Sequence, residues 1–324
     1  MPGRVSVPNH HTCTSMCLMK SRNNRTTTML YFALTLLLVN QCYSADIVDT
    51  LVGKPIASTL VQLVQKAGLV DTLKQGTFTV FAPTDAAFNK VPAATLTSLL
   101  GDPQALGDLL KYHVVVGGYR SRDLTNEQTF TTVAGDKIRV NVYNHNGIVT
   151  VNVAKVTDAD EVADNGFIHF IDSVIMPPEG SVVTAVSNDP DLSTLLSAIT
   201  KAGIANDFLS DPLTVFAPTN DAFARIDSND LNRLLASPER LIETLKYHEV
   251  PHTLYSKGMW NHEYPKSTDS HEDRLHIRVN SDGVTINNAK VTTADISVTN
   301  GVVHKIDHVL IPVRVAFWLR LNGK

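Results

Sequence analysis

The feature that most constrains this chain is an internal duplication with a constant offset of 135 residues. The hexapeptide Thr79–Thr84 recurs unchanged as Thr214–Thr219, and the tetrapeptide Leu110–His113 recurs as Leu245–His248. The same offset relates Ala154–Thr157 to Ala289–Thr292, Asn165-Gly166 to Asn300-Gly301, His169 to His304 and Asp172 to Asp307. A copy of this length is a domain rather than one unit of a solenoid, so the sequence predicts two tandem domains of one fold.

The duplication divides the chain into four segments. Residues 46–180 form the first repeat and residues 181–313 form the second. Residues 1–44 precede the duplication, and residues 314–324 form a short C-terminal tail. The join Pro177–Gly180 is short and contains two prolines. We therefore expect it to limit the relative motion of the repeats more than a glycine- and serine-rich linker would.

Residues 1–44 have the order of a secretory signal. The basic stretch Lys20–Arg25 is followed by the apolar run Met29–Val39, and Cys42–Ser44 places small residues before a cleavage point at Ala45. The apolar run is shorter than the roughly 20 residues that span a bilayer. The segment predicts a cleaved signal peptide rather than a membrane anchor, and hence a secreted, extracellular chain without a transmembrane segment.

Cysteine usage and charge restrict what the secreted chain can do. All three cysteines precede Ala45, so the remainder has no disulfide and no thiolate ligand, and each repeat depends on its own apolar core. Without the four basic residues of residues 1–44, 24 Lys and Arg face 32 Asp and Glu, a net charge of −8. This acidic balance, without a basic run, argues against nucleic acid or anionic lipid as the main partner.

Each repeat combines a helical first half with a strand-rich second half. Apolar residues at helical spacing predict helices over Thr59–Ala67, Ala105–Tyr112, Thr194–Ala202 and Leu241–Tyr247. A short apolar strand is expected at Phe78–Ala82, and alternating apolar residues from Phe130 onward predict further strands. Asn146-Gly147 and Asp282-Gly283 are typical of hairpin turns. This order predicts an α+β fold for each domain.

Two motifs in a fixed order carry a family resemblance. Thr77–Phe88 and Asn165–Pro177 resemble the two signatures of fasciclin domains, a Tyr-His pair lies between them, and the second repeat keeps the same order. The resemblance covers about Asp46–Val313. It implies that each repeat is a β-sandwich wrapped by helices. It further implies a secreted or surface-attached protein, because members of this family mediate cell adhesion, bind integrins and associate with the extracellular matrix.

The Tyr-His pairs are the first candidate receptor-binding site. They are Tyr112-His113 and Tyr247-His248, and the resemblance implies integrin binding at these positions. The residues alone allow another interpretation. Each pair ends an amphipathic helix, where both rings can pack while keeping a polar atom bonded. Packing and direct partner contact both remain open.

A second family motif distinguishes the repeats. The second repeat keeps an Asp-Ile pair before its Asn-Gly, as Asp295-Ile296, whereas the first repeat has Asp160-Glu161. A carboxylate can complete the coordination of a divalent cation in a receptor, and the isoleucine would add apolar contact. The resemblance therefore implies integrin contact mainly through the second repeat.

Most signature residues have a structural interpretation. We expect Phe81, Phe88, Phe216 and Phe223 in the cores, and Thr84 and Thr219 as helix caps. His169 and His304 lie inside strands between apolar neighbours, so we expect hydrogen-bonded structural histidines. Asp172 and Asp307 close these strands as turn residues.

One enzyme motif occurs, in His248–His252, which matches H-E-x-x-H. In zinc proteases a single helix presents both imidazoles to the metal. Pro251 would interrupt that helix, and the equivalent Val114–Gly117 is typical of a strand. We therefore expect no catalytic residues, cofactor or structural metal, although weak metal binding within His248–His276 remains open.

Two functions remain. The first is a non-enzymatic adhesion or matrix-interaction protein, whose partners would be cell-surface receptors such as integrins or matrix proteins. The second is a secreted module that binds a soluble ligand such as a glycan or a small hydrophobe, because a fold alone does not determine its partner.

Overall fold

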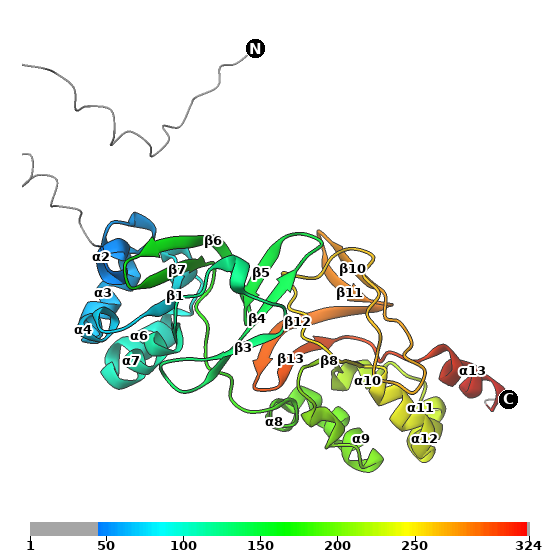
Figure 1. The fold of residues 1–324 in the computed structure, drawn as a ribbon. Helices are drawn as coiled ribbons and strands as arrows, with labels where there is room; N and C mark the ends of the chain where they lie inside the picture. Colours follow the sequence, from blue (N-terminus) through cyan, green and yellow to red (C-terminus); the bar gives the residue numbers. More distant parts are fainter. Residues whose placement is uncertain (1–44, 323–324) are drawn as a thin grey trace, which may run out of the picture. The chain divides into compact units, whose positions relative to one another are not determined.

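The computed structural model describes residues 45–322. The predicted signal peptide, residues 1–44, lies outside the described residues. Both repeats have the α+β order that the sequence predicts, with helices first and most strands later (Figure 1).

Two helices of repeat one begin or end beside residues that favour helix ends. Thr84 caps α5, because its hydroxyl accepts a hydrogen bond from the backbone N–H of Ala87 at 3.2 Å. The helix α3 ends just before Gly68, whose φ of 67° favours glycine. The α-helices are α2 (Ile47–Val52), α3 (Ser58–Lys66), α4 (Val70–Lys74), α5 (Asp85–Phe88), α6 (Ala93–Gly101) and α7 (Pro103–Tyr112).

The strands of repeat one form one bent sheet in the order β2-β1-β7-β6-β5-β4-β3. Only the β1–β7 pair is parallel in this sheet. Register shifts along β6 bend the sheet, and a bridge between Val115 and Thr132 brings its two ends together. The strands are β1 (Phe78–Pro83), β2 (Val114–Val116), β3 (Gln128–Thr131), β4 (Lys137–Tyr143), β5 (Ile148–Val151), β6 (Ala154–Ala163) and β7 (Gly166–Ile171).

The bent sheet has a core on each side. Along β1, Val80 packs into the core beneath the helices, whereas its neighbour Phe81 packs into the core enclosed by the sheet. Tyr112 and Ile171 join Phe81 in the enclosed core. Alternation of side chains along the strands thus produces a sandwich with helices covering one face.

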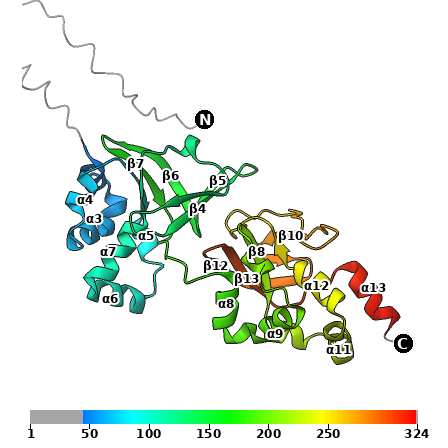
Figure 2. The ribbon, with the colours of Figure 1, turned by 60° about the horizontal axis from the view of Figure 1, so that its bottom comes forward.

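Repeat two has the same plan with one strand fewer (Figure 2). The counterpart of β3 is reduced to isolated bridges at Glu263 and Lys266. Pro265 stands where repeat one has Phe130, and a proline cannot donate to a strand ladder. The sheet order is β10-β11-β12-β13-β8-β9. The elements are α8 (Val182–Asn188), α9 (Ser193–Ala202), β8 (Leu213–Pro218), α10 (Asn220–Ala224), α11 (Ser228–Ala236), α12 (Pro238–Lys246), β9 (Glu249–Val250), β10 (Ile277–Asn280), β11 (Gly283–Ile286), β12 (Ala289–Val298) and β13 (Gly301–Ile306).

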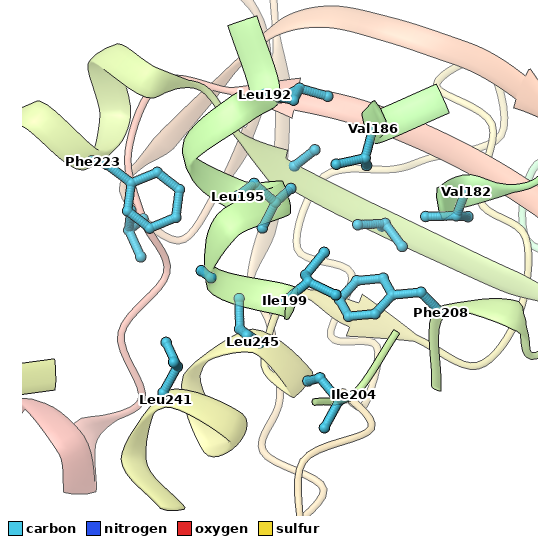
Figure 3. Close-up of a cluster of buried hydrophobic side chains, with 14 of the residues drawn as sticks. Val182, Val186, Leu192, Leu195, Ile199, Ile204, Phe208, Phe223, Leu241 and Leu245 are labelled. Carbon is cyan, nitrogen blue, oxygen red and sulfur yellow. The ribbon is translucent and has the colours of Figure 1, made fainter. Parts of the chain in front are cut away.

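The helical core of repeat two gathers around α9. Figure 3 shows Leu195 and Ile199 of α9 facing Phe208, Phe223 and Leu245. All five side chains are buried. The predicted core positions Phe81, Phe88, Phe216 and Phe223 are likewise buried, which confirms their assignment.

The segment set apart as a C-terminal tail is helical. Helix α13 spans Val313–Leu321, and its Val315 and Leu319 are buried in the core of repeat two. It lies against α11 and α12. Repeat two therefore has a covering helix after its last strand.

The Asn-Gly signature is explained by the contacts of Asn165 and Gly166. A Cβ on Gly166 would lie 1.8 Å from the carbonyl oxygen of Phe78, so only glycine fits between β7 and β1. Asn165 accepts a hydrogen bond from the N–H of Ile47 at 2.9 Å and donates to the carbonyl of Leu73 at 2.7 Å. The signature therefore joins the amino-terminal helices to the sheet.

Candidate receptor-binding motifs and the contact between the repeats

The Tyr-His pairs end the helices α7 and α12 and are buried in both repeats. Tyr112 and His113 are 0% and 2% exposed, and Tyr247 and His248 are 7% and 1% exposed. The side chains that the resemblance assigns to receptor contact therefore lie inside the folded domains. A receptor could reach them only if the end of α7 or α12 moved.

Both tyrosine hydroxyls have two partners. The Tyr112 hydroxyl donates to the carbonyl of Lys137 at 3.0 Å and accepts from the side chain of Asn152 at 2.9 Å. The Tyr247 hydroxyl likewise donates to the carbonyl of Arg274 and accepts from the side chain of Asn287. Burial raises the pKa of Tyr112 to about 12, so the phenol stays protonated. These contacts link the helix end to the sheet.

Both nitrogens of His113 and His248 are also engaged. Nδ1 of His248 donates to the carbonyl of Thr244 at 2.8 Å, and Nε2 accepts from the N–H of Leu310 at 2.9 Å. His113 is held in the same way, by Leu109 and Ile175. Burial lowers the pKa of both histidines to about 4, so the rings are neutral at pH 7.

His169 and His304 are structural, as predicted. Nε2 of His304 donates to the carbonyl of Leu254 at 2.8 Å, and Nδ1 accepts from the N–H of Asp295 at 3.2 Å. His169 makes the equivalent bonds to Tyr119 and Asp160. Each histidine thus fixes the aspartate that begins the second family motif.

Asp295 has a left-handed backbone with φ 63°, at an irregularity in β12. Its carboxylate accepts from the N–H of Ser256 at 2.7 Å and from the Ser256 hydroxyl. Ile296 is half-buried and packs against the helical core of repeat two. The motif therefore has a structural role of its own, although both of its side chains retain some exposure.

Repeat one keeps this geometry at the aspartate and loses it at the next residue. Asp160 has φ 63° and accepts from the N–H of Ser121 at 2.6 Å. Glu161 instead forms an ion pair with Lys54 at 2.7 Å. The two repeats are therefore alike at the carboxylate and differ at the apolar position beside it.

The H-E-x-x-H match is not presented on one helix. The helix α12 ends at Lys246, and Glu249 lies in the strand β9. Glu249 is buried, accepts from the hydroxyl of Thr268 at 2.7 Å, and has its pKa raised to about 7 by burial. Among residues 45–322, no group of three or more His, Cys, Asp or Glu side chains is arranged to hold a metal ion.

A polar network joins the repeats, and its centre is Glu127. This carboxylate accepts from the N–H of Thr253 in repeat two at 2.7 Å and from the side chain of Asn141 at 3.0 Å. Arg139 donates to the same carboxylate at 3.1 Å and also pairs with Asp211 of repeat two. A partly buried carboxylate with several donors is a strong anchor.

A second part of the contact is aromatic. The hydroxyl of Tyr143 accepts from the N–H of Tyr255 at 3.0 Å. A Cβ on Gly258 would lie 2.0 Å from the Tyr143 ring, so this ring requires a glycine opposite it. Lys257 completes the contact with an ion pair to Asp172 at 2.7 Å.

The motifs shared by the two copies do not reveal this contact, because several of its central residues differ between the repeats. Glu127 and Asn141 have His262 and His276 at the equivalent positions of repeat two. Two other contact residues, Arg139 and Asp172, recur as Arg274 and Asp307, but their recurrence does not mark a contact between the repeats. A search for polar residues that differ between the copies could have found them.

Comparison with known proteins decides the family. Residues 55–177 and residues 190–312 each match the Fasciclin domain. The chain belongs to the fasciclin-domain family. Each of the two matches lies within one repeat of the duplication.

Two relatives align with both fasciclin repeats. The chain is 32% identical to transforming growth factor-beta-induced protein ig-h3 of Oryctolagus cuniculus, over 73% of this chain and 35% of the relative. It is 29% identical to periostin of Homo sapiens, over 83% of this chain and 31% of the relative. The chain thus spans about a third of the length of these relatives.

A solved structure aligns with most of this chain. It is a FAS1 domain pair from the insect cell adhesion molecule Fasciclin I. The alignment covers 80% of this chain and 98% of the solved chain, at 18% identity and a TM-score of 0.40.

In the part of the chain that the structure describes, no helix is long and apolar enough to cross a membrane.

Proposed function

We propose that this protein is a secreted, non-enzymatic protein of cell adhesion or of the extracellular matrix. The observation that carries the proposal is the similarity to ig-h3 and periostin across both fasciclin repeats, over 73% and 83% of the chain. The fasciclin family resemblance supplies the adhesive role. The network around Glu127 supports it further, because it presents the two repeats to a partner as one joined unit.

We propose integrin-type receptors or matrix proteins as the partners. The Asp295-Ile296 motif is the accessible candidate, because both side chains are half-buried beside the exposed residues Thr292–Ala294. The buried Tyr112-His113 and Tyr247-His248 pairs stay a prediction that requires the helix ends to open. Contact at Asp295-Ile296 requires no opening of the core.

The first experiment is a cell-adhesion assay on surfaces coated with the purified chain. Cells should attach in proportion to the coating density, and integrin-blocking reagents should reduce the attachment. Attachment that resists these reagents would leave a matrix or other receptor partner. An absence of attachment at every coating density would contradict the adhesive function.

The second experiment uses Asp295→Asn, with Asp160→Asn as a matched control. Both changes remove a charge from a carboxylate that accepts from a serine N–H and hydroxyl, so the loss of stability within each domain should be similar. We expect at least a threefold loss of adhesion for Asp295→Asn and little loss for Asp160→Asn, a magnitude of about 0.7 kcal/mol. Equal adhesion by both variants would remove this motif from the proposal.

The alternative function, binding of a soluble ligand, has less support. An apolar cavity of repeat one, beside Leu51, Leu60 and Phe78, measures ≈ 20 Å³. That space accommodates about one water molecule, not a small hydrophobe. Saturable binding of a glycan or lipid by the purified chain, without cell adhesion, would favour this alternative.

A further inference from the structure

The helix α13 has a second apolar face that no described residue covers. Val315 and Leu319 face the core of repeat two. On another side of the helix, Val313, Phe317 and Leu321 are 83%, 62% and 62% exposed. Their spacing of four residues places them in one stripe. Large apolar side chains gathered on a surface usually mark a contact site.

Repeat one contains an uncovered counterpart of the surface that α13 covers in repeat two. The helices α6 and α11 occupy equivalent positions at the offset of 135 residues. Helix α13 lies against α11, and Leu234 of α11 is 1% exposed. The equivalent Leu99 of α6 is only half-buried, and α6 has no buried residue.

The packing beneath α6 is also incomplete. A small apolar cavity there is lined by Leu96 and Leu99 of α6 together with Leu109 of α7 and Met176. Met176 is itself 37% exposed. Three leucines of α6, Leu96, Leu99 and Leu100, are therefore only partly covered, while the counterpart of this surface in repeat two is closed by a helix.

Polar positions around this surface also correspond. In repeat two, Arg314 of α13 donates to Glu243 of α12 at 3.0 Å. The residue equivalent to Glu243 in repeat one is Asp108 of α7, and it is exposed. Arg320 of α13 is exposed and lies one turn from Phe317. Asp108 pairs with Lys111 of its own helix at 3.2 Å, and its exposed carboxylate can accept from Arg320 as well, just as Glu243 accepts from both Arg240 and Arg314.

We propose that α13 of one copy docks on α6 and α7 of repeat one in a second copy of this chain. The stripe Val313, Phe317 and Leu321 packs against α6, and Arg320 pairs with Asp108. The two surfaces differ, so the contact is heterologous and builds an open chain or a ring rather than a twofold dimer. This self-association goes beyond the adhesive function and does not depend on it.

Two blocked variants test the contact. Phe317→Glu disables α13, and the double variant Ser98→Arg with Asp108→Arg disables the surface of α6 and α7. All three positions are exposed, and circular dichroism will confirm that the folds are retained. Sedimentation velocity of the wild-type chain between ~1 and ~200 μM should show a mass that rises with concentration, as a small interface predicts.

Each blocked variant should remain monomeric alone, and an equimolar mixture should form a dimer. In that mixture, the intact α13 of the double variant can bind the intact α6–α7 surface of the Phe317→Glu variant. Arg320→Asp and Asp108→Arg should each weaken association about tenfold or more, and the two changes combined in one chain should restore it.

Four results would overturn the proposal. The first is a wild-type chain that stays monomeric at every concentration, and the second is a mixture of the blocked variants that stays monomeric. The third is an association that Phe317→Glu abolishes but the double variant leaves intact. The fourth is a monomeric wild-type chain that binds anionic vesicles through α13. The third result would mean that α13 pairs with α13 instead.

Discussion

Several titratable side chains are held out of water in this protein, and burial shifts their pKa values in opposite senses. His113 and His248 have pKa values lowered to about 4, whereas the pKa of Glu249 is raised to about 7. All three groups favour the neutral form. The free energy of unfolding therefore contains pH-dependent contributions of opposite sign, and single substitutions can separate them.

A neutral replacement of a buried histidine should reduce acid sensitivity. The unfolded chain binds a proton near pH 6.5, and folded His113 binds one only near pH 4, so this histidine costs stability as the pH falls through that window. By pH 5 the cost is about 2 kcal/mol. His113→Gln should therefore gain about 2 kcal/mol relative to wild type between pH 7.5 and pH 5, by urea denaturation. A constant difference would contradict the buried, neutral assignment.

Glu249→Gln should act in the opposite direction. The unfolded carboxyl ionises near pH 4.5 and folded Glu249 near pH 7, so wild type loses stability as the pH rises through this window. The variant should be more stable than wild type by about 3 kcal/mol at pH 7.5 and by under about 1 kcal/mol at pH 5. The same measurement applies. Equal stability of both proteins at pH 7.5 would place water or an unrecognised cation beside this carboxylate.

At the scale of helices and strands, segments with periodic apolar residues could be predicted from the sequence. Segments that lack an equivalent in the other repeat could not. The helical spacing of Thr194–Ala202 and the cap at Thr84 correspond to α9 and α5. The loss of the β3 counterpart follows from Pro265, a single residue that similarity between the copies conceals. Residues 314–324 follow the duplicated segment, so no comparison between the copies predicts helix α13, in which Arg314 binds Glu243.

The candidate sites were less predictable, because exposure depends on packing between distant segments. Tyr112 lies at the end of an amphipathic helix, and nothing in its own sequence shows that Asn152 and Lys137 enclose its hydroxyl. Asp295 likewise meets Ser256, which lies 39 residues away. Motif position singles out these residues, while tertiary contacts determine their surroundings in the fold.

The contact between Asp295 and Ser256 predicts an asymmetric loosening. Ser256 lies in the segment Thr253–Gly258 that contacts repeat one. Asp295→Ala should therefore speed amide hydrogen exchange at Tyr255 and Thr253, whose N–H groups bond to repeat one. Asp160→Ala should speed exchange at Ser121 and leave the contact between the repeats protected. Equal protection of Tyr255 in both variants would show that Asp295 does not support this contact.

At the scale of the whole molecule, the duplicated domains have diverged where they meet. Glu127, Asn141 and Tyr143 of repeat one bind the segment from Thr253 to Gly258, while the equivalent residues of repeat two are His262, His276 and Arg278. The signature residues that define each fold are shared by both copies. The shared residues thus build the two cores, and residues that differ between the copies make most of the contact that joins them.

Glu127 lies at the centre of the contact between the repeats. Glu127 accepts from Thr253, Asn141 and Arg139, so Glu127→Ala leaves three donors without their partner at a cost of about 3 kcal/mol. The wild-type chain should unfold in one calorimetric transition, because the repeats support each other, and Glu127→Ala should unfold in two. Glu179→Ala, at an exposed carboxylate of the linker, is the matched control and should keep one transition. If Glu127→Ala also keeps one transition at an unchanged Tm, the repeats are coupled by the aromatic contact of Tyr143 rather than by this carboxylate.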